Sequence, residues 1–245
     1  MSHPFSTALI TGAGHRIGAA CALALARQGI AVVIHYGSAR EAARTLQQTI
    51  RTGGGEAHLL QGDLADAGET GRLLPQAEAL LGGRVVEILV NNAAIFLPGT
   101  VRDGPLEVWN RHLDINLTAP FLLMQSFARR LPPEGRGKII QIIDQKGHRP
   151  RPGYAAYSAA KSALWTLTRL AALELAPAIQ VNAIGPGPIL PAPGASQAAF
   201  EGVAAATPAG RSGTPEEIGA ALLFLLRHDF ITGEMIRVDG GEHLL

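Results

Sequence analysis

The chain has 245 residues, 47% hydrophobic and 17% charged, with a net charge of +1. This suits one α/β domain with a sheet buried on both faces, and the lack of a basic block argues against nucleic acid or an anionic membrane as partners. No apolar run reaches the ~18 residues of a membrane span, no signal peptide is readable, and the single Cys21 cannot form an internal disulfide. We therefore expect a cytoplasmic protein.

Short apolar runs alternate along the chain with longer segments of helical periodicity. The predicted strands are residues 7–11, 31–35, 57–61, 87–91, 138–143, 180–184 and 235–238. Helices are predicted near residues 17–28, 39–52, 70–81, 105–131 (broken in two), 155–175 and 215–226. Strict alternation of strand and helix is typical of a parallel sheet covered by helices on both faces. We predict an α/β fold with a doubly wound, seven-stranded parallel sheet in a single domain, 1–245.

One long stretch, residues 185–214, shows neither strand nor helix periodicity and is rich in Gly, Pro and Ala. A loop of this length in a compact domain is usually functional, often as a lid over a site. The alternative is an insertion without a role. We predict a substrate lid at about residues 185–214.

A glycine-rich turn lies between the first predicted strand and the first helix, and its sequence is Thr11-Gly12-Ala13-Gly14-His15-Arg16-Ile17-Gly18. Glycines let the backbone approach a pyrophosphate closely, and the helix N-terminus supplies free N–H groups and partial positive charge. A plain tight turn is the alternative. Its position after the first strand favours a dinucleotide site.

The second predicted strand ends without an Asp or Glu, in His35-Tyr36-Gly37-Ser38-Ala39-Arg40. An acid there would bind a ribose 2′-hydroxyl and repel a 2′-phosphate. Its absence, together with Ser38, Arg40 and Arg16, favours NADP(H) over NAD(H). The alternative for Arg40 is an exposed residue at a helix start, where a cation opposes the helix dipole.

Three residues carry the candidate chemistry: Asp144, Tyr157 thirteen positions later, and Lys161. Residues four apart share a helix face, so Tyr157 and Lys161 can point into one cleft. A neighbouring cation favours the phenolate, so we expect Lys161 to lower the pKa of Tyr157 and make it a general acid or base. A surface tyrosine beside a solvated lysine is the alternative.

Taken in order, the motifs resemble the short-chain dehydrogenase/reductase family over nearly the whole chain. The resemblance rests on the glycine-rich turn, Asp63, Asn91-Asn92-Ala93-Ala94, Asn116, Tyr157-x-x-x-Lys161, Gly185-Pro186-Gly187, and Ile231-Thr232-Gly233 leading to Asp239-Gly240-Gly241. It implies a Rossmann-type fold, the cofactor NADP(H) and a homotetramer packed through long helices. No metal site is predicted.

The resemblance also implies residue roles. Tyr157 would donate the proton, Lys161 would bind the nicotinamide ribose, and Asn116 would hold a water that relays protons to Lys161. Asp63 would contact the adenine and Asn91 would support the cofactor. The full set of predicted cofactor contacts is Gly12, Gly14, His15, Arg16, Ile17, Gly18, His35, Tyr36, Ser38, Arg40, Asp63, Leu64, Asn91, Ala93, Tyr157, Lys161, Pro186 and Gly187.

Two departures from the family pattern narrow the range of expected substrates. Asp144 stands where the family has its catalytic serine, and Arg16 stands where the turn commonly has glycine. Both resemble the pteridine reductase branch, which includes bacterial dihydromonapterin and dihydrofolate reductases. Phe96 falls where that branch stacks a phenylalanine on the pterin ring, although core packing is the alternative. The predicted substrate contacts are Arg16, Phe96, Asp144 and Tyr157.

The sequence therefore predicts an NADPH-dependent reductase that transfers hydride to the imine of a dihydropterin. A carboxyl group can accept from the N–H groups of a pterin edge, whereas a serine hydroxyl suits a ketone oxygen. Two alternatives stay open. One is a carbonyl reductase of 3-oxoacyl thioesters or small ketones. The other is a fold retained for nucleotide sensing or assembly without catalysis.

Overall fold

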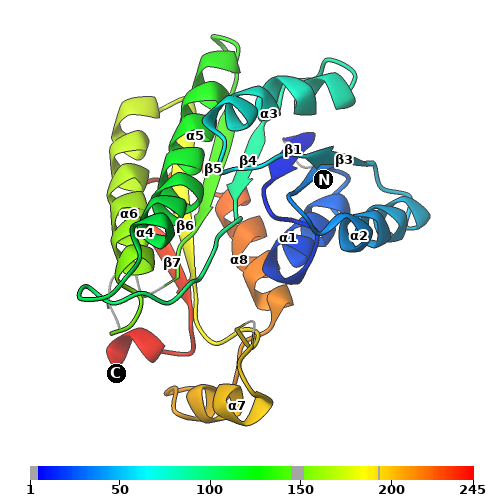
Figure 1. The fold of residues 1–245 in the computed structure, drawn as a ribbon. Coiled ribbons are helices and arrows are strands. Elements are labelled where there is room, and N and C mark those ends of the chain that lie inside the picture. Colours follow the sequence, from blue (N-terminus) through cyan, green and yellow to red (C-terminus); the bar gives the residue numbers. More distant parts are fainter. Residues whose placement is uncertain (1–4, 145–151, 193) are drawn as a thin grey trace.

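The computed structural model describes residues 5–144, 152–192 and 194–245. Its centre is a parallel sheet of seven strands in the order β3-β2-β1-β4-β5-β6-β7, with helices on both faces (Figure 1). The strands are β1 (Thr7–Ile10), β2 (Ala31–Tyr36), β3 (Ala57–Gln61), β4 (Ile88–Asn91), β5 (Gly137–Ile142), β6 (Ile179–Pro186) and β7 (Met235–Val238). The predicted fold class and all seven predicted strands are confirmed.

The main helices also follow the prediction. They are α1 (Arg16–Ala26), α2 (Arg40–Thr52), α3 (Ala67–Leu80), α4 (Leu106–Leu113), α5 (Ala119–Arg130), α6 (Ala155–Leu175) and α8 (Pro215–Arg227). Two further elements, α7 (Gln197–Ala205) and the 3-10 turn η3 (Glu242–Leu244), lie outside the predicted set, whereas the π-helical turn η1 (Asp114–Thr118) lies inside the predicted segment 105–131. Within the described residues, no helix is both long and apolar enough to cross a bilayer.

Alternating side chains of each strand supply the two halves of the core. In β4, Ile88 and Val90 pack on the face covered by α1, α2 and α8. Leu89, between them, packs on the face covered by α3 and α5. Because both faces are covered, most strand residues are apolar, although β5 and β6 also bury Lys138, Gln141 and Asn182.

The predicted helix 105–131 is not broken but changes its hydrogen-bond pattern in the middle. The π turn η1 joins α4 directly to α5, and Pro120 opens the first turn of α5. Proline has no N–H, so it cannot donate to the carbonyl four residues earlier, which belongs to Asn116. The local slip of the helical ladder therefore occurs at a predicted catalytic residue.

The predicted lid segment is more ordered than the sequence suggested. β6 extends to Pro186, and α7 occupies the middle of residues 185–214. The Ser196 hydroxyl caps α7 by accepting a hydrogen bond from the N–H of Ala199 (3.2 Å). In Figure 1, α7 lies apart from the main body, beyond the ends of β6 and β7.

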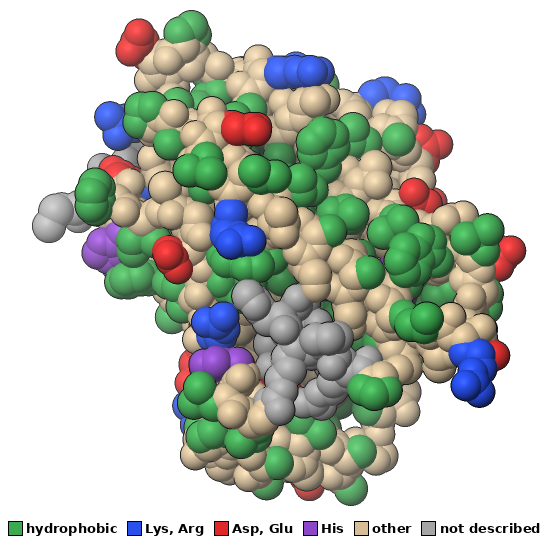
Figure 2. All heavy atoms as spheres, turned by 90° about the vertical axis from the view of Figure 1, so that its left-hand side faces the viewer, with side chains coloured by type: hydrophobic (Ala, Val, Ile, Leu, Met, Phe, Trp, Pro, Cys, Tyr) green, Lys and Arg blue, Asp and Glu red, His purple; other side chains and the backbone are tan. Residues whose placement is uncertain are grey.

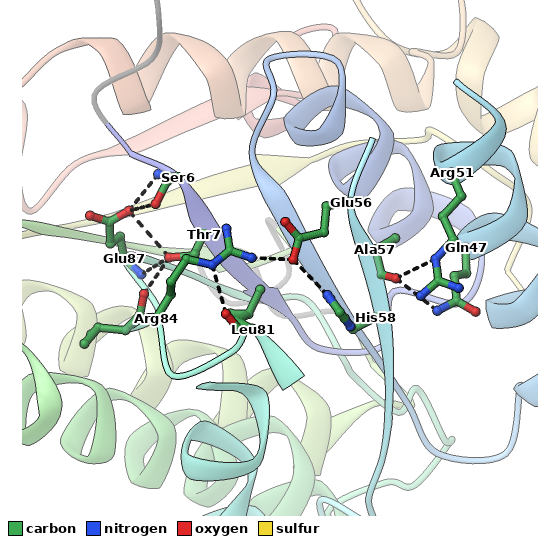
Figure 3. A network of polar contacts seen from close by, with 11 residues as sticks. Ser6, Thr7, Gln47, Arg51, Glu56, Ala57, His58, Leu81, Arg84 and Glu87 are labelled. Atoms are coloured by element: carbon green, nitrogen blue, oxygen red, sulfur yellow. Dashed lines mark hydrogen bonds and ion pairs between the residues drawn. The ribbon is translucent and has the colours of Figure 1, made fainter. Parts of the chain in front are cut away.

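A polar network links the amino-terminal ends of β1, β3 and β4 (Figure 3). The Glu87 carboxylate accepts from the Ser6 N–H (2.6 Å) and hydroxyl (2.8 Å). Glu56 pairs with Arg84 and contacts His58 (2.9 Å). These groups are largely exposed, and such pairs contribute ~0–1 kcal/mol each. The amino-terminal end of the sheet thus carries ordinary surface contacts, whereas the predicted site residues lie at its carboxyl end.

Candidate functional site

A cleft of about 720 Å³ opens at the carboxyl ends of the strands. In a doubly wound sheet this is where ligands bind, next to the reversal of strand order between β1 and β4. The cleft combines the β1–α1 turn, the loop after β4, the end of β5, α6 and the segment after β6. Its lining includes Gly12, His15, Arg16, Ile17, Gly18, Asn92, Ala93, Phe96, Asp144, Tyr157, Lys161, Pro186, Gly187, Phe200, Val203 and Glu242.

The glycine-rich turn is packed so tightly that side chains are excluded. Gly12 has a φ of +59°, and a Cβ there would lie 2.8 Å from the Ala93 Cα. A Cβ on Gly18 would lie 2.5 Å from the Asn92 Nδ2. Helix α1 starts here with no side-chain cap and no acidic residue in its first turn. Its N–H groups and positive dipole end can therefore receive an anion.

Arg16 holds a backbone conformation that normally belongs to glycine. Its φ is +58°, the one positive value for a non-glycine residue in the described chain, which costs ~1–2 kcal/mol. Its guanidinium donates to the carbonyls of Pro191 (2.8 Å) and Leu190 (3.4 Å). Arg16 thus links the turn to the segment after β6, which with α7 forms the outer wall of the cleft.

His35 lies beneath the turn and not among the cleft-lining residues. Its Nδ1 accepts from the N–H of Gly12 (3.2 Å), and its Nε2 donates to the carbonyl of Gly62 (3.1 Å). Burial lowers the pKa of His35 to about 4, so the ring is neutral and can serve as acceptor and donor at once. The predicted cofactor contact is instead a support for the turn.

The other predicted cofactor contacts outside the cleft lining lie near the ends of β2 and β3. Ser38 and Arg40 are exposed, and a Cβ on Gly14 would lie 3.2 Å from the Ala39 carbonyl, so this turn adjoins the glycine-rich one. Tyr36 and Leu64 are buried, while Asp63 is exposed and accepts from the Ala65 N–H (2.9 Å). Their contacts with a cofactor stay predictions.

Asn92, rather than Asn91, supports the turn. The Asn92 amide donates to the carbonyls of Thr11 (2.9 Å) and Gly12 (3.0 Å). The Thr11 hydroxyl accepts from the N–H groups of Asn92 (3.0 Å) and Ala93 (3.1 Å). The Asn91 side chain is buried without a hydrogen-bond partner in the described structure. The supporting role was predicted for Asn91, but Asn91 is the last residue of β4 and stays in the core, whereas Asn92 follows the strand.

Asp144, Tyr157 and Lys161 meet in the cleft. Tyr157 and Lys161 project from the first two turns of α6, and Asp144 follows β5. The Tyr157 hydroxyl donates to the Asp144 carboxylate. The Lys161 ammonium donates to the Ile142 carbonyl (2.9 Å) and lies 5.9 Å from the Tyr157 ring centroid.

The expected direction of the Tyr157 pKa is wrong for this arrangement. Burial, followed by the negative charge and hydrogen bond of Asp144, raises the pKa of Tyr157 well above 10. Burial lowers the pKa of Lys161 to about 8, although Asp144 opposes the shift. The four-residue spacing reports only the lysine, whereas the Asp144 carboxylate accepts a hydrogen bond from the phenol directly. Tyr157 is thus kept protonated, the state a proton donor needs.

Phe96 stands in an aromatic wall of the cleft. Its ring stacks on Tyr154 (centroids 4.2 Å apart, planes 10° apart) and meets the ring of Tyr157 edge-on (4.8 Å, 82°). Tyr154 is held by a bridge to Gly99, whose N–H donates to the Gly153 carbonyl (2.8 Å). One face of Phe96 is therefore covered by Tyr154.

Asn116 is fully buried behind this wall and does not line the cleft. Its Oδ1 accepts from the N–H of Ile95 (2.9 Å), and its Nδ2 donates to the carbonyl of Ile95 (3.0 Å) and contacts His112 Nδ1 (3.0 Å). The Asn116 side chain thus fixes the loop that carries Phe96. Its predicted role in a water relay stays a prediction.

Three residues of the site besides Asn92 were not predicted from the sequence: His112, Tyr154 and Glu242. Glu242 reaches the cleft from η3, and its side chain is mostly buried. Asp239 holds this segment by accepting from the N–H groups of Gly241 (3.0 Å) and His243 (3.1 Å). The motif Asp239-Gly240-Gly241 precedes Glu242 directly, but it did not indicate a role for Glu242, whose position depends on the packing of the last turn.

Comparison with known proteins gives one consistent family and three different activities. A family model described as "Enoyl-(Acyl carrier protein) reductase" matches residues 12–243. A 3-oxoacyl-[acyl-carrier-protein] reductase from Synechocystis is 36% identical over 238 residues, which cover 96% of this chain and 95% of the relative.

Two similar solved structures are FolM alternative dihydrofolate reductase 1 from Brucella canis and Brucella suis, each in complex with NADP. The first has a TM-score of 0.94 at 34% identity and covers 100% of this chain and 96% of its own. The second has a TM-score of 0.94 at 35% identity, with coverage of 100% and 97%.

Proposed function

Because the chain belongs to the short-chain dehydrogenase/reductase family, we propose that it is an NADPH-dependent reductase that converts dihydropterins to tetrahydropterins. The cofactor is NADP(H), which the two similar FolM structures hold. The tight glycine turn, the uncapped start of α1 and Arg16 form an anion-binding corner that fits its pyrophosphate. Ser38 and Arg40, beside this corner, would contact the 2′-phosphate.

The observation that carries the proposal is the hydrogen bond from Tyr157 to Asp144. A carboxylate that receives this hydroxyl has no proton to donate to a ketone oxygen. Its negative charge would also oppose an alkoxide forming beside it. The same carboxylate can accept from the N–H groups of an aminopyrimidine edge. Asp144 therefore favours a substrate with N–H donors and an imine over a ketone.

In the proposed reaction, bound NADPH supplies a hydride to the imine carbon. The chain orients the planar ring against the aromatic side chain of Phe96 and supplies a proton to the nitrogen through the protonated Tyr157. Lys161, with a pKa of about 8, would hold the ribose and restore the proton, with Asn116 as the relay residue behind it. Glu242 would offer a second carboxylate to the N–H groups of the substrate.

A second candidate is reduction of a 3-oxoacyl thioester. The Synechocystis relative carries this activity in its name, and the apolar side chains of Ile189, Phe200 and Val203 on the outer wall could receive an acyl chain. Asp144 argues against this activity, because residues 142–144, at the end of β5, include no serine or threonine whose hydroxyl could donate to a ketone oxygen.

The two candidates separate in one assay. We expect NADPH oxidation with dihydromonapterin, dihydrobiopterin or dihydrofolate, and at least tenfold lower kcat/KM with a 3-oxoacyl thioester. Asp144→Ser should lower pterin turnover and raise ketone reduction, because a hydroxyl can donate to a ketone oxygen. Turnover of the thioester alone would refute the pterin assignment. An Asp144→Ser enzyme with unchanged preference would refute the role given to Asp144.

We further propose a cytoplasmic homotetramer. Figure 2 shows the side of the molecule that carries α6, where hydrophobic side chains reach the surface. Phe121 on α5 and Leu170 and Leu173 on α6 are exposed. Light scattering after gel filtration should give four times the chain mass, and a monomer would contradict this assembly.

A further inference from the structure

His112, near the end of α4, touches three parts of the site without reaching the cleft. It is fully buried, its Nδ1 lies 3.0 Å from the Asn116 Nδ2, and its Nε2 lies 3.2 Å from both the carbonyl oxygen and the nitrogen of Leu97. Its ring also meets the Tyr157 ring edge-on at 5.9 Å. His112 can therefore act only through its neighbours.

The contacts of Ile95 fix which atoms of His112 carry protons. The Ile95 N–H can only donate and its carbonyl can only accept, so the Asn116 amide cannot turn over without losing both bonds. The remaining amide hydrogen then points at His112 Nδ1, which must be unprotonated. A neutral imidazole then carries its proton on Nε2 and donates to the Leu97 carbonyl.

We infer that His112 is a positioning residue that holds the Phe96 loop and Asn116 in place only while its ring is neutral with the proton on Nε2. Ile95 and Leu97 flank Phe96, so Asn116 and His112 fix the loop on either side of the aromatic wall. The inference rests on the proposed function in one respect, the role of Phe96 as a contact of the planar substrate.

Protonation of His112 would undo this arrangement. A proton on Nδ1 would face the Asn116 amide hydrogen, so two donors would oppose each other. The new charge would also lie near Lys161 on α6 and Arg111 on α4, while Tyr157 and the Asn116 amide face the ring as uncharged groups. Burial, Lys161 and Arg111 keep the pKa of His112 below 6.5. Activity should therefore fall as pH drops below that value.

Two variants test the role. His112→Leu removes both hydrogen bonds at similar volume, and we expect KM for the substrate to rise roughly tenfold, as for a lost buried hydrogen bond. The dissociation constant for NADPH should stay within twofold. His112→Asn places an amide oxygen near the Nδ1 position and should recover part of the loss. Neither variant has a titratable side chain at position 112, so in both the activity should fall less as the pH drops below 6.5 than in the wild type.

A matched control is His58→Gln. His58 lies in the polar network at the amino-terminal end of the sheet, paired with Glu56 (2.9 Å), so its replacement should leave the pH profile unchanged. If His112→Leu keeps the full fall in activity below pH 6.5, or loses NADPH affinity as strongly as substrate affinity, the inference is wrong.

The tautomer can be read without any substrate. Nitrogen-15 NMR of the wild-type protein should show the Nε2–H tautomer for His112 and a titration midpoint below pH 6.5. An Nδ1–H tautomer, which would let Nε2 accept from the Leu97 N–H, would overturn the inference. Kinetics use whichever substrate turns over, so a failed pterin assignment and a failed role for His112 give different results.

Discussion

At the scale of single residues, the site is set by two buried groups whose pKa values are shifted relative to water. Tyr157 keeps its proton because burial and Asp144 disfavour the phenolate. Lys161 gives up its proton more readily, since burial lowers its pKa to about 8. A donor that stays protonated beside a cation near its titration point is suited to supply protons at neutral pH.

This arrangement predicts that kcat/KM falls at alkaline pH. Because the Lys161 ammonium is lost as pH rises through about 8, kcat/KM of the wild type should fall tenfold per pH unit above that value. Tyr157 cannot cause this fall, as its pKa lies well above 10. Lys161→Arg keeps its charge at high pH, so its residual activity should not fall there. A wild-type profile that is flat to pH 9.5 would contradict the assignment.

At the scale of elements, the glycine-rich turn depends on close approach. Gly18 faces Asn92 and the Gly12 carbonyl, and a methyl group there would lie 2.5 and 2.6 Å from them. Gly18→Ala should force the turn away from the β4 loop and raise the NADPH dissociation constant at least tenfold, measured by fluorescence titration. Gly71→Ala is the matched control.

Gly71 lies in α3, and nothing is within 4 Å of an added Cβ. The control should leave cofactor binding unchanged and stabilise the protein by ~0.5–1 kcal/mol, as alanine does in a helix. Equal cofactor affinity in the two variants would show that the turn does not need its close approach.

The sequence predicts elements well where local patterns decide them. Apolar runs marked the strands because a strand covered on both faces is mostly apolar, and the four-residue spacing predicted that Tyr157 and Lys161 lie together. Helix α7 escaped notice because its alanine-rich segment has no apolar stripe that contrasts with polar positions. The roles of His35, His112 and Asn92 depend on contacts between segments far apart in the chain, which periodicity does not report.

At the scale of the whole molecule, His35 couples stability to pH. Its pKa is about 4 in the folded protein against 6.5 when unfolded, so the unfolded chain binds the extra proton. Its contribution is complete above pH 6.5 and is lost as pH falls toward 4, up to about 3 kcal/mol. Urea unfolding should show this slope in the wild type.

His35→Asn cannot titrate and should unfold with a flatter pH dependence, whatever its stability at pH 7. If His35→Asn loses as much stability between pH 6.5 and 4 as the wild type, another group is responsible.

The tyrosines of the aromatic wall also provide a spectroscopic signal from the site. The chain has three tyrosines, and Tyr36, Tyr154 and Tyr157 all lie near the carboxyl end of the sheet, two of them in contact with Phe96. Neither tryptophan, Trp109 or Trp165, lines the cleft. The tyrosine bands of the near-ultraviolet circular dichroism spectrum therefore report on the carboxyl end of the sheet, which carries the cleft. Changes in these bands can be used to monitor ligand binding without a label.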